Sequence, residues 1–411
     1  MQDGDSRVLE SSDNPPNEII EDKELIDAYC VYRGLNESQS TALTTTVTGL
    51  LLELKPHIRL IQGPPGTGKT ATLATLLSIL SCLKQRTLVC APTNVAISEV
   101  ILRFMEFFTA KPPAASNKCL LFGQFCALYR PAEGEDCVQL GDVVLIGNKD
   151  RLNLEGPLEQ VFLDWRVDRL MDAFSPVCGW RASKSSLLEF LRSSTTQYET
   201  YKETQTNEVE GLSFIKFLKQ TLKLLAEKFL NHCHVLGNDL PSSFTSASGV
   251  SVLGKCSMLV KRFLDKVMQS DKKVEDEMLR CFRDSSGVQI NEAAKNKSAS
   301  SFAKLMLELQ DALAAMPDNV TCLKVPNQPT REWMHEKCLE HARLVFSTLS
   351  SAGRHILLKS KPFQCVIVDE ASQCVEAETV IVTSMKKVKQ MLLVGDQMQL
   401  PATVISQVGT S

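Results

Sequence analysis

A glycine-rich segment lies between a run of apolar residues and a helical pattern, and it reads Gly63-Pro64-Pro65-Gly66-Thr67-Gly68-Lys69-Thr70. Glycines have no side chains, so consecutive backbone N–H groups can turn toward one anion, and the helix that follows adds the positive end of its dipole. A Gly/Pro turn without function is the alternative, but strand, loop and helix occur in the order that a phosphate-binding loop needs. In such a loop Lys69 contacts the β- and γ-phosphates of ATP, and the Thr70 hydroxyl binds Mg²⁺.

Two neighbouring carboxylates, Asp369 and Glu370, follow the apolar run Val366-Ile367-Val368. Open α/β sheets bind ligands beyond the carboxyl ends of their strands, so this pair is expected near the phosphate loop. Asp369 would then hold Mg²⁺, and Glu370 would orient and deprotonate the water that attacks the γ-phosphate. An acidic pair by itself is usually solvated surface, but its place at the end of a short apolar strand favours the catalytic interpretation.

Five short apolar runs supply the strands that would carry these residues: Ile58–Ile61, Thr87–Ala91, Ala342–Ser347, Gln364–Val368 and Met391–Val394. A possible sixth is Val143–Ile146. Most are apolar at consecutive positions, which predicts strands buried on both faces of a parallel sheet. Helical patterns such as Thr70–Leu83 and Asn94–Phe108 alternate with them. The alternation predicts an α/β fold with a doubly wound parallel sheet.

The stretch between the second and third of the five runs has a different pattern. Apolar residues recur there at helical spacing from Phe214 to Phe229 and from Phe302 to Met316, which predicts a large, mostly helical insertion. Two polar tracts in it, Ser193–Gly211 and Gln269–Glu277, are predicted to be loops. The expected organisation is a disordered leader and short helix (1–34), the first part of the α/β lobe (35–110), the insertion (111–335) and the second part of that lobe (336–411).

Composition narrows the class of protein. The formal charge is -3, from 45 Lys and Arg against 48 Asp and Glu, so there is no global basic field and any nucleic-acid contact must be local. The 14 cysteines include no CxxC pair, which favours a reducing compartment. The adjacent residues His232, Cys233 and His234 lack the spacing of zinc ligands. Neither a secretory leader nor an apolar run of roughly 20 residues is present, so no contact with a membrane is expected.

Five motifs follow one another along the chain: Leu35-Asn36-Glu37-Ser38-Gln39, the phosphate loop, Ala91-Pro92-Thr93-Asn94, Asp369-Glu370-Ala371-Ser372 and Gly395-Asp396-Gln397-Met398-Gln399-Leu400-Pro401. This series closely resembles the superfamily 1 helicases, in the branch that contains senataxin, its plant relatives and the nonsense-mediated-decay RNA helicase. The resemblance is strong over about 35–108 and 340–405 and loose over the insertion. It implies a RecA-like P-loop motor lobe that couples ATP to single-stranded RNA or DNA, in the nucleus or the cytoplasm, with the nucleus favoured.

The resemblance also implies roles for two glutamines in the nucleotide site. Gln39 would recognise the adenine by a paired amide contact, and Gln399 would sense the γ-phosphate and couple it to the groove that binds the strand. The cofactors that follow are ATP and Mg²⁺.

Contacts with a single strand are carried over in the same way. The Pro92-Thr93-Asn94 turn would contact the sugar-phosphate backbone, and Thr348 matches a second position of this kind. For Thr348, a hydroxyl that caps a turn is an equally good interpretation. Basic residues of the insertion would extend the track, although a solvated helix face has the same pattern; they are Lys216, Lys219 and Lys223.

Helicases of this class use arginines from a second motor lobe, and the chain stops at Ser411, shortly after the last motif. We therefore expect the second lobe to be absent and this chain to be a weak ATPase, since loss of a comparable arginine lowers rates by about 10³ to 10⁵. Two alternatives stay open on sequence alone. One is a nucleotide- or nucleic-acid-binding fragment without turnover, and the other is a P-loop ATPase unrelated to nucleic acid.

Overall fold

The computed structural model describes residues 26–52, 55–109, 139–204, 212–270, 272–283, 301–318, 320–321, 325–326 and 328–399. The chain divides into two compact units. Unit 1 comprises 1–131 and 362–411, and unit 2 comprises 132–361. The predicted short helix is present at 26–32, whereas most of the predicted leader and the Leu400-Pro401 end of the last motif lie outside the described residues.

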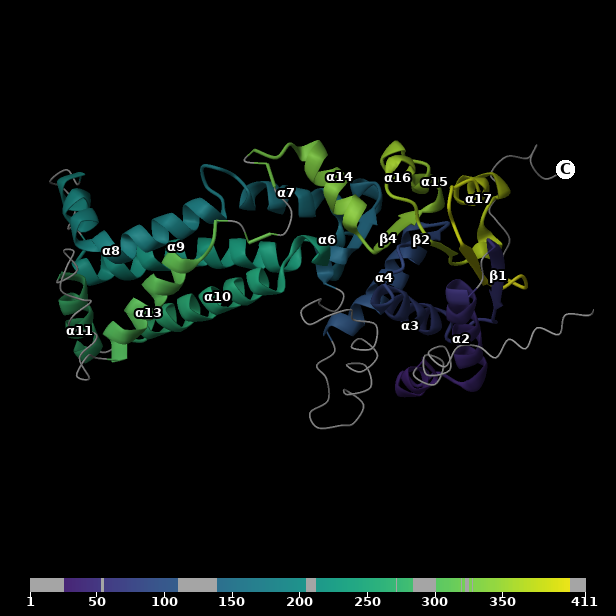
Figure 1. Cartoon of the computed structure of the whole chain (residues 1–411), viewed down its shortest axis with the longest axis horizontal. Coiled ribbons are helices and arrows are strands. Elements are labelled where there is room, and N and C mark those ends of the chain that lie inside the picture. The colour runs from purple at the N-terminus through teal and green to yellow at the C-terminus, as the bar shows by residue number, and fades with distance from the viewer. Residues whose placement is uncertain are drawn as a thin grey trace, which may run out of the picture. The chain divides into compact units, whose positions relative to one another are not determined.

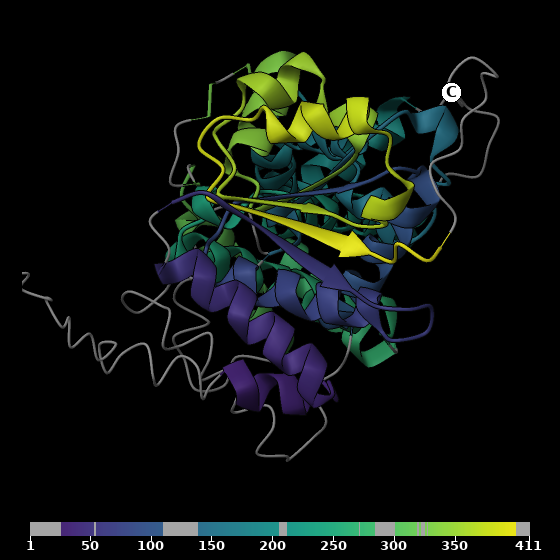
Figure 2. The same cartoon turned by 90° about the vertical axis from the view of Figure 1, so that its right-hand side faces the viewer.

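Unit 1 contains four parallel strands in the order β1-β6-β5-β2. Their bounds are β1 (His57–Gln62), β2 (Thr87–Ala91), β5 (Cys365–Val368) and β6 (Gln390–Gly395). The helices α2 (Glu37–Leu52) and α3 (Lys69–Cys82) lie on one face of these strands and α17 (Glu376–Thr383) lies on the other, as Figures 1 and 2 show. A further helix, α4 (Asn94–Thr109), follows β2 and contacts both β2 and α3. The helices on both faces confirm the doubly wound arrangement.

The central strands of unit 1 are buried as the sequence predicts. Every residue of β2 and β5 is inaccessible to solvent, in keeping with consecutive apolar positions in a parallel sheet. In β1 the expectation is wrong, because partly exposed and fully exposed positions alternate and the side chains of Ile58 and Leu60 are 63% and 75% exposed. Among the described residues β1 pairs only with β6, so it is an edge strand with one covered face.

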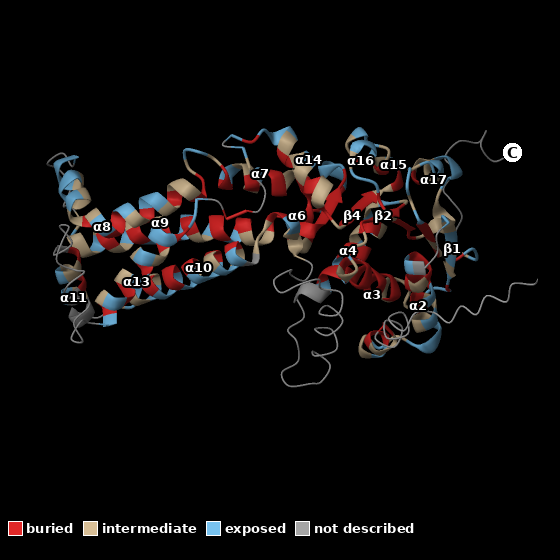
Figure 3. Cartoon of the chain, in the orientation of Figure 1, coloured by how far each residue is buried: buried red, intermediate tan, exposed pale blue. Residues whose placement is uncertain are grey.

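Unit 2 contains the predicted sixth strand, β3 (Val143–Ile146), paired in parallel with β4 (Leu344–Thr348). The rest of its described part is mainly helical, with α6 (Pro157–Val161), α7 (Leu163–Ala173), α8 (Trp180–Thr204), α9 (Phe214–Asn238), α10 (Ala247–Met268), α11 (Lys272–Arg283), α13 (Ser301–Ala315), α14 (Arg331–His341), α15 (Leu349–Ala352) and α16 (His355–Lys359). Figure 3 shows that the long helices α8, α9, α10 and α13 each carry a buried and an exposed face. Burial of one apolar stripe per helix explains the periodicity read from the sequence.

The two polar tracts predicted to be loops are partly helical. Helix α8 continues to Thr204, with a single non-helical residue at Ser193, and α11 begins at Lys272. Tertiary packing overrides local composition here, because Tyr198 in the first tract contacts the rings of Phe214 and Phe217 on α9. Only the part of the first tract from 205 to 211 lies outside the described residues.

Two buried polar side chains in unit 2, those of His232 and Arg166, bind several partners. The ring of His232 lies 3.0 Å from Ser183 Oγ through Nδ1 and 3.3 Å from Asp172 Oδ2 through Nε2, so it joins α9 to α7 and α8. The Arg166 guanidinium on α7 is fully buried and donates to four backbone carbonyls, those of Leu140, Gly141, Val143 and Gln160. Across the described residues, no helix has both the length and the apolar character that a membrane span requires.

Replacing Arg166 by leucine is expected to lower the free energy of unfolding by about 3 kcal/mol, because four backbone carbonyls would lose the guanidinium as a hydrogen-bond donor. Denaturant titration followed by tryptophan fluorescence measures this loss. Arg192→Leu, on the exposed face of α8, is the matched control and should change stability by less than about 0.5 kcal/mol. Equal effects of the two substitutions would show that the carbonyl contacts contribute little.

Candidate nucleotide-binding site

The phosphate loop joins β1 to α3 and has the backbone that glycine permits. Gly66 and Gly68 have positive φ angles of 77° and 79°, in the left-handed region that L-residues with side chains rarely adopt. Space also requires glycine, since a Cβ on Gly63 would lie 2.7 Å from the hydroxyl oxygen of Thr67. Gly68 directly precedes α3, so the first N–H groups of that helix open toward the loop.

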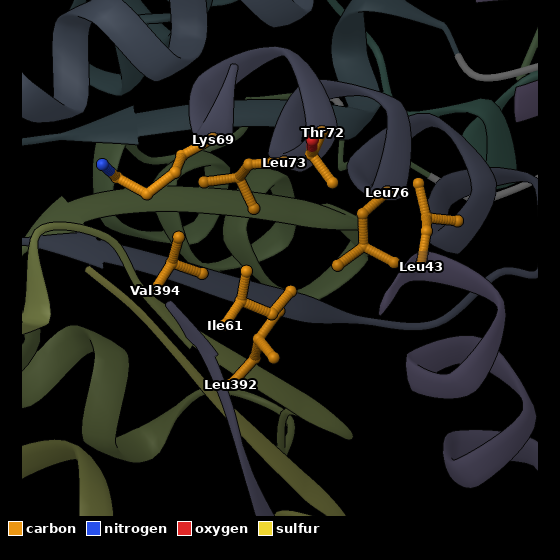
Figure 4. Close-up of a pocket in the computed structure, with 8 residues that line it drawn as sticks. All are labelled: Leu43, Ile61, Lys69, Thr72, Leu73, Leu76, Leu392 and Val394. Carbon is orange, nitrogen blue, oxygen red and sulfur yellow. The ribbon is translucent and has the colours of Figure 1, made fainter. Parts of the chain in front are cut away.

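Lys69 extends back over this loop. Its Nζ donates to the carbonyl oxygens of Gly63 at 2.7 Å and Pro64 at 3.3 Å, which places the ammonium beside the loop backbone. Figure 4 shows Lys69 at the rim of a small pocket below α3, with its ammonium directed away from the other lining residues, which are Leu43, Ile61, Thr72, Leu73, Leu76, Leu392 and Val394. This pocket is almost entirely apolar, so it belongs to the packing of α2 and α3 on the strands and not to a phosphate site.

Gln39, at the start of α2, is joined to the phosphate loop. Its Nε2 donates to the Thr67 carbonyl at 2.7 Å, while its Oε1 accepts the backbone N–H of Asn36 at 2.9 Å. The Asn36 side chain in return accepts the N–H of Gln39 at 2.9 Å. A Cβ on Gly68 would lie 2.7 Å from Gln39 Nε2, so this contact also depends on glycine. The structure therefore brings the predicted adenine-recognising residue to the loop.

Asp369 stands directly beyond the end of β5. Its N–H donates to the Cys90 carbonyl at 2.8 Å, and the residue is only 5% exposed. Burial raises the pKa of the Asp369 carboxyl to about 6; the negative charge of Glu370 also raises it, while the backbone N–H of Glu370 and the Lys69 ammonium lower it. Asp369 follows β5 and the phosphate loop follows β1, and β6 pairs with both strands in parallel, so the predicted magnesium ligand and the loop lie at the same edge of the sheet.

Glu370 has a φ of +49°, which is a strained conformation for a residue with a side chain. It begins the short 3₁₀ helix η4 (Ala371–Gln373), and its Oε2 accepts a hydrogen bond of 3.2 Å from Gln373 Nε2. The end of β6 lies against this turn, because a Cβ on Gly395 would lie 3.1 Å from the backbone nitrogen of Ser372. Surrounding contacts thus hold the turn that presents the second carboxylate.

The last motif supplies a residue to which the sequence alone gave no role. Asp396 is buried, its Oδ1 accepts the N–H of Met398 at 3.0 Å, and its Oδ2 accepts Nε2 of Gln399 at 3.2 Å. Asp396 therefore orients the predicted γ-phosphate sensor. Its position just after an apolar strand was the available signal, the same one that singled out Asp369. The phosphate loop meets this strand directly, since the N–H of Gly63 donates to the carbonyl of Gly395 at 3.2 Å.

Two of the residues predicted to contact a single strand, Thr93 and Thr348, cap helices with their hydroxyls. Thr93, in the Pro92-Thr93-Asn94 turn after β2, accepts the N–H of Ala96 on its hydroxyl at 3.2 Å. In unit 2 the hydroxyl of Thr348 accepts the N–H of Ser351 at 3.3 Å, which is the capping role that the sequence left open. A cap leaves the second lone pair of each hydroxyl for another donor, so nucleic-acid contact remains a prediction for both.

The basic residues of α9 differ in their surroundings. Lys219 forms a half-buried ion pair of 2.7 Å with Glu275, and Lys223 lies 3.9 Å from Glu227. Lys216 is exposed. For Lys219 the ion pair that fixes α11 to α9 is a sufficient reason for the charge, so α9 gives little support to a continuous track.

Residues 34–407 match the protein family described as AAA domain, which covers both halves of the site. The chain belongs to this family. Relatives with helicase names include three from a plant and two yeasts. The chain is 54% identical to "Probable helicase MAGATAMA 3" of Arabidopsis thaliana over 71 residues, 17% of this chain and 9% of the relative. It is 26% identical to "Helicase sen1" of Schizosaccharomyces pombe over 371 residues, 86% and 16% of the two chains. It is 22% identical to "Helicase SEN1" of Saccharomyces cerevisiae over 426 aligned residues, 97% and 14%.

These matches confirm the resemblance drawn from the motifs. The chain is part of a superfamily 1 helicase motor region, in the branch that contains senataxin and the nonsense-mediated-decay RNA helicase, and its parallel strands and phosphate loop are those of a RecA-like P-loop NTPase fold. It spans no more than 16% of the length of the three relatives. Activity, substrates and partners of whole helicases therefore apply to this chain only as proposals.

The raised pKa of Asp369 makes a prediction about stability without nucleotide or magnesium. The native state retains the proton up to pH of about 6 and the unfolded chain only to about 4, so stability falls as pH rises between these values, by up to about 3 kcal/mol. Asp369→Asn should therefore raise the melting temperature at pH 7.5 and leave it unchanged at pH 4. Thermal scans at the two pH values test this, with the exposed Asp265→Asn as control. A similar shift at both pH values would contradict it.

Proposed function

We propose that this chain is the ATP-binding motor lobe of a superfamily 1 helicase and couples ATP hydrolysis to single-stranded RNA or DNA. One observation carries the proposal. The phosphate loop, the Asp369-Glu370 pair and the Asp396–Gln399 pair follow three adjacent parallel strands and meet at the same edge of the sheet in unit 1. That edge is where open α/β sheets bind nucleotides. Family membership and the helicase relatives support the same reading.

In the proposed mechanism the loop and α3 bind the triphosphate through their N–H groups, and Lys69 leaves its carbonyl partners to contact the β- and γ-phosphates. The Thr70 hydroxyl and the Asp369 carboxylate are oxygen donors of the kind that Mg²⁺ prefers, and bound Mg²⁺ would neutralise charge on the phosphates. Glu370 takes a proton from water as the water oxygen bonds to the γ-phosphorus. The bond from that phosphorus to the β–γ bridging oxygen breaks, which yields ADP and phosphate.

Recognition of adenine by Gln39 is chemically consistent with its contacts. Each end of its amide makes one hydrogen bond, yet the oxygen has a second lone pair and the nitrogen a second hydrogen. A paired bond to the adenine N6 amine and N7 can be added without breaking the link to the loop. Gln39 would in this way link recognition of the adenine base to the loop that binds the phosphates.

Coupling to a strand is assigned to Gln399 and to four residues that would contact the strand. Gln399, oriented by Asp396 at the end of β6, would respond to the γ-phosphate. The Pro92-Thr93-Asn94 turn and Thr348 would contact the sugar-phosphate backbone, so binding would not depend on base sequence. We place this function in the nucleus or the cytoplasm, as the resemblance suggests.

Lys69→Ala should weaken binding of ATP by at least about 100-fold, because a charge-assisted contact to two phosphates is lost. Isothermal titration calorimetry with Mg²⁺ and ATP measures it. The exposed Lys216→Ala should bind as the unsubstituted chain does. Full affinity of the Lys69 variant would refute the assignment of the loop.

Glu370→Gln should bind ATP normally and lower phosphate release by about 10² to 10⁴, the usual contribution of a general base. The assay is phosphate release with and without single-stranded RNA or DNA. Release that the strand stimulates and the substitution abolishes supports the motor-lobe function. Binding without release would favour a non-catalytic fragment, and release that no strand affects would favour a P-loop ATPase unrelated to nucleic acid.

A further inference from the structure

Gln373 lies one turn after the acidic pair, and its amide reaches back to the carboxylate of Glu370. The distance from Gln373 Nε2 to Glu370 Oε2 is 3.2 Å. Both side chains are only partly buried, so packing alone does not fix the direction of the glutamate. A glutamate has three rotatable side-chain bonds, and its carboxylate can point many ways unless a partner holds it. The Gln373 amide is that partner.

The backbone of the turn is rigid enough for this contact to be set by the fold. The N–H of Gln373 donates to the Glu370 carbonyl at 3.0 Å, and the Cys374 thiol lies 3.6 Å from the same oxygen. The end of β6 lies close to the other side of the turn, where a Cβ on Gly395 would be 3.1 Å from the backbone nitrogen of Ser372. Glu370 keeps its left-handed backbone because these neighbours over-determine it. Gln373 is therefore placed by the same turn that presents the carboxylate.

A neutral amide suits this task chemically. It donates to one carboxylate oxygen and leaves the second oxygen to accept a proton from water. A lysine or arginine in its place would fix the carboxylate more strongly but would stabilise its charge and so weaken it as a base. We propose that Gln373 is a positioning residue for Glu370, holding the carboxylate toward the water that attacks the γ-phosphate. This inference rests on the proposed function of the site.

The test compares two complexes of the full chain. Affinities for Mg²⁺–ADP and for Mg²⁺–ADP with aluminium fluoride, which mimics the phosphoryl group under attack, are measured by calorimetry. Gln373→Ala should weaken the aluminium fluoride complex about 10-fold, as expected for one hydrogen bond to a charged group, and leave ADP affinity and the melting temperature unchanged. In a Glu370→Gln background, Gln373→Ala should have no further effect. Gln85→Ala, far along the chain in the turn after α3, is the control and should change neither affinity.

Gln373→Glu provides a second variant of nearly the same size, which replaces the donor by a like charge and should weaken the aluminium fluoride complex at least as much. The proposal would be overturned if the Gln373→Ala variant bound each of the two complexes as tightly as the unsubstituted chain does. A parallel loss of ADP affinity or of folding in both Gln373 variants, or an undiminished effect in the Glu370→Gln background, would also overturn it. Failure of the unsubstituted chain to bind ADP at all would instead refute the proposed function.

Discussion

Parallel pairing of β1, β6 and β5 is the constraint on which the site depends. Because strands in a parallel sheet run the same way, their carboxyl ends meet at one edge, and whatever follows each strand is brought to that edge. The hydrogen bond from the Gly63 N–H to the Gly395 carbonyl joins the phosphate loop to the end of a strand more than 300 residues away in the chain. Slipping one strand by a single residue would move Asp369 or Asp396 to the other face.

The same convergence makes the site electrostatically unfavourable before a ligand binds. Asp369 is buried beside Glu370, with Lys69 as the nearby opposing charge, and burial raises its pKa. A phosphate-bound metal ion would reverse that balance, because two carboxylates are destabilising next to each other and favourable next to a cation. The strained backbone of Glu370 and the close approach of Gly395 to the turn also lower local stability, and both help to position the carboxylates of the site.

Sequence reasoning succeeded where a residue's role depends on its own neighbours. The glycines of the loop, the apolar residues of β2 and β5 and the helical spacing in α9 and α13 each satisfy a local requirement, so their patterns are visible without a structure. It failed where residues far away in the sequence decide the burial or the secondary structure of a segment. The half-exposed β1 follows from its having one partner strand among the described residues, and the helical course of residues 194–204 follows from aromatic contacts with α9.

What the sequence determined by itself is the chemistry that is available: a loop that can bind phosphate, two carboxylates at a strand end and a family membership carried by the order of motifs. Only the tertiary structure decided how those groups are held. The hydrogen bonds that Gln399 donates to Asp396 and that Gln373 donates to Glu370 each join residues three positions apart, yet nothing in local composition requires them. They form because strands far apart in the chain pair in one register. That pairing fixes the positions of the turns after the strands, and the turns set the directions of these side chains.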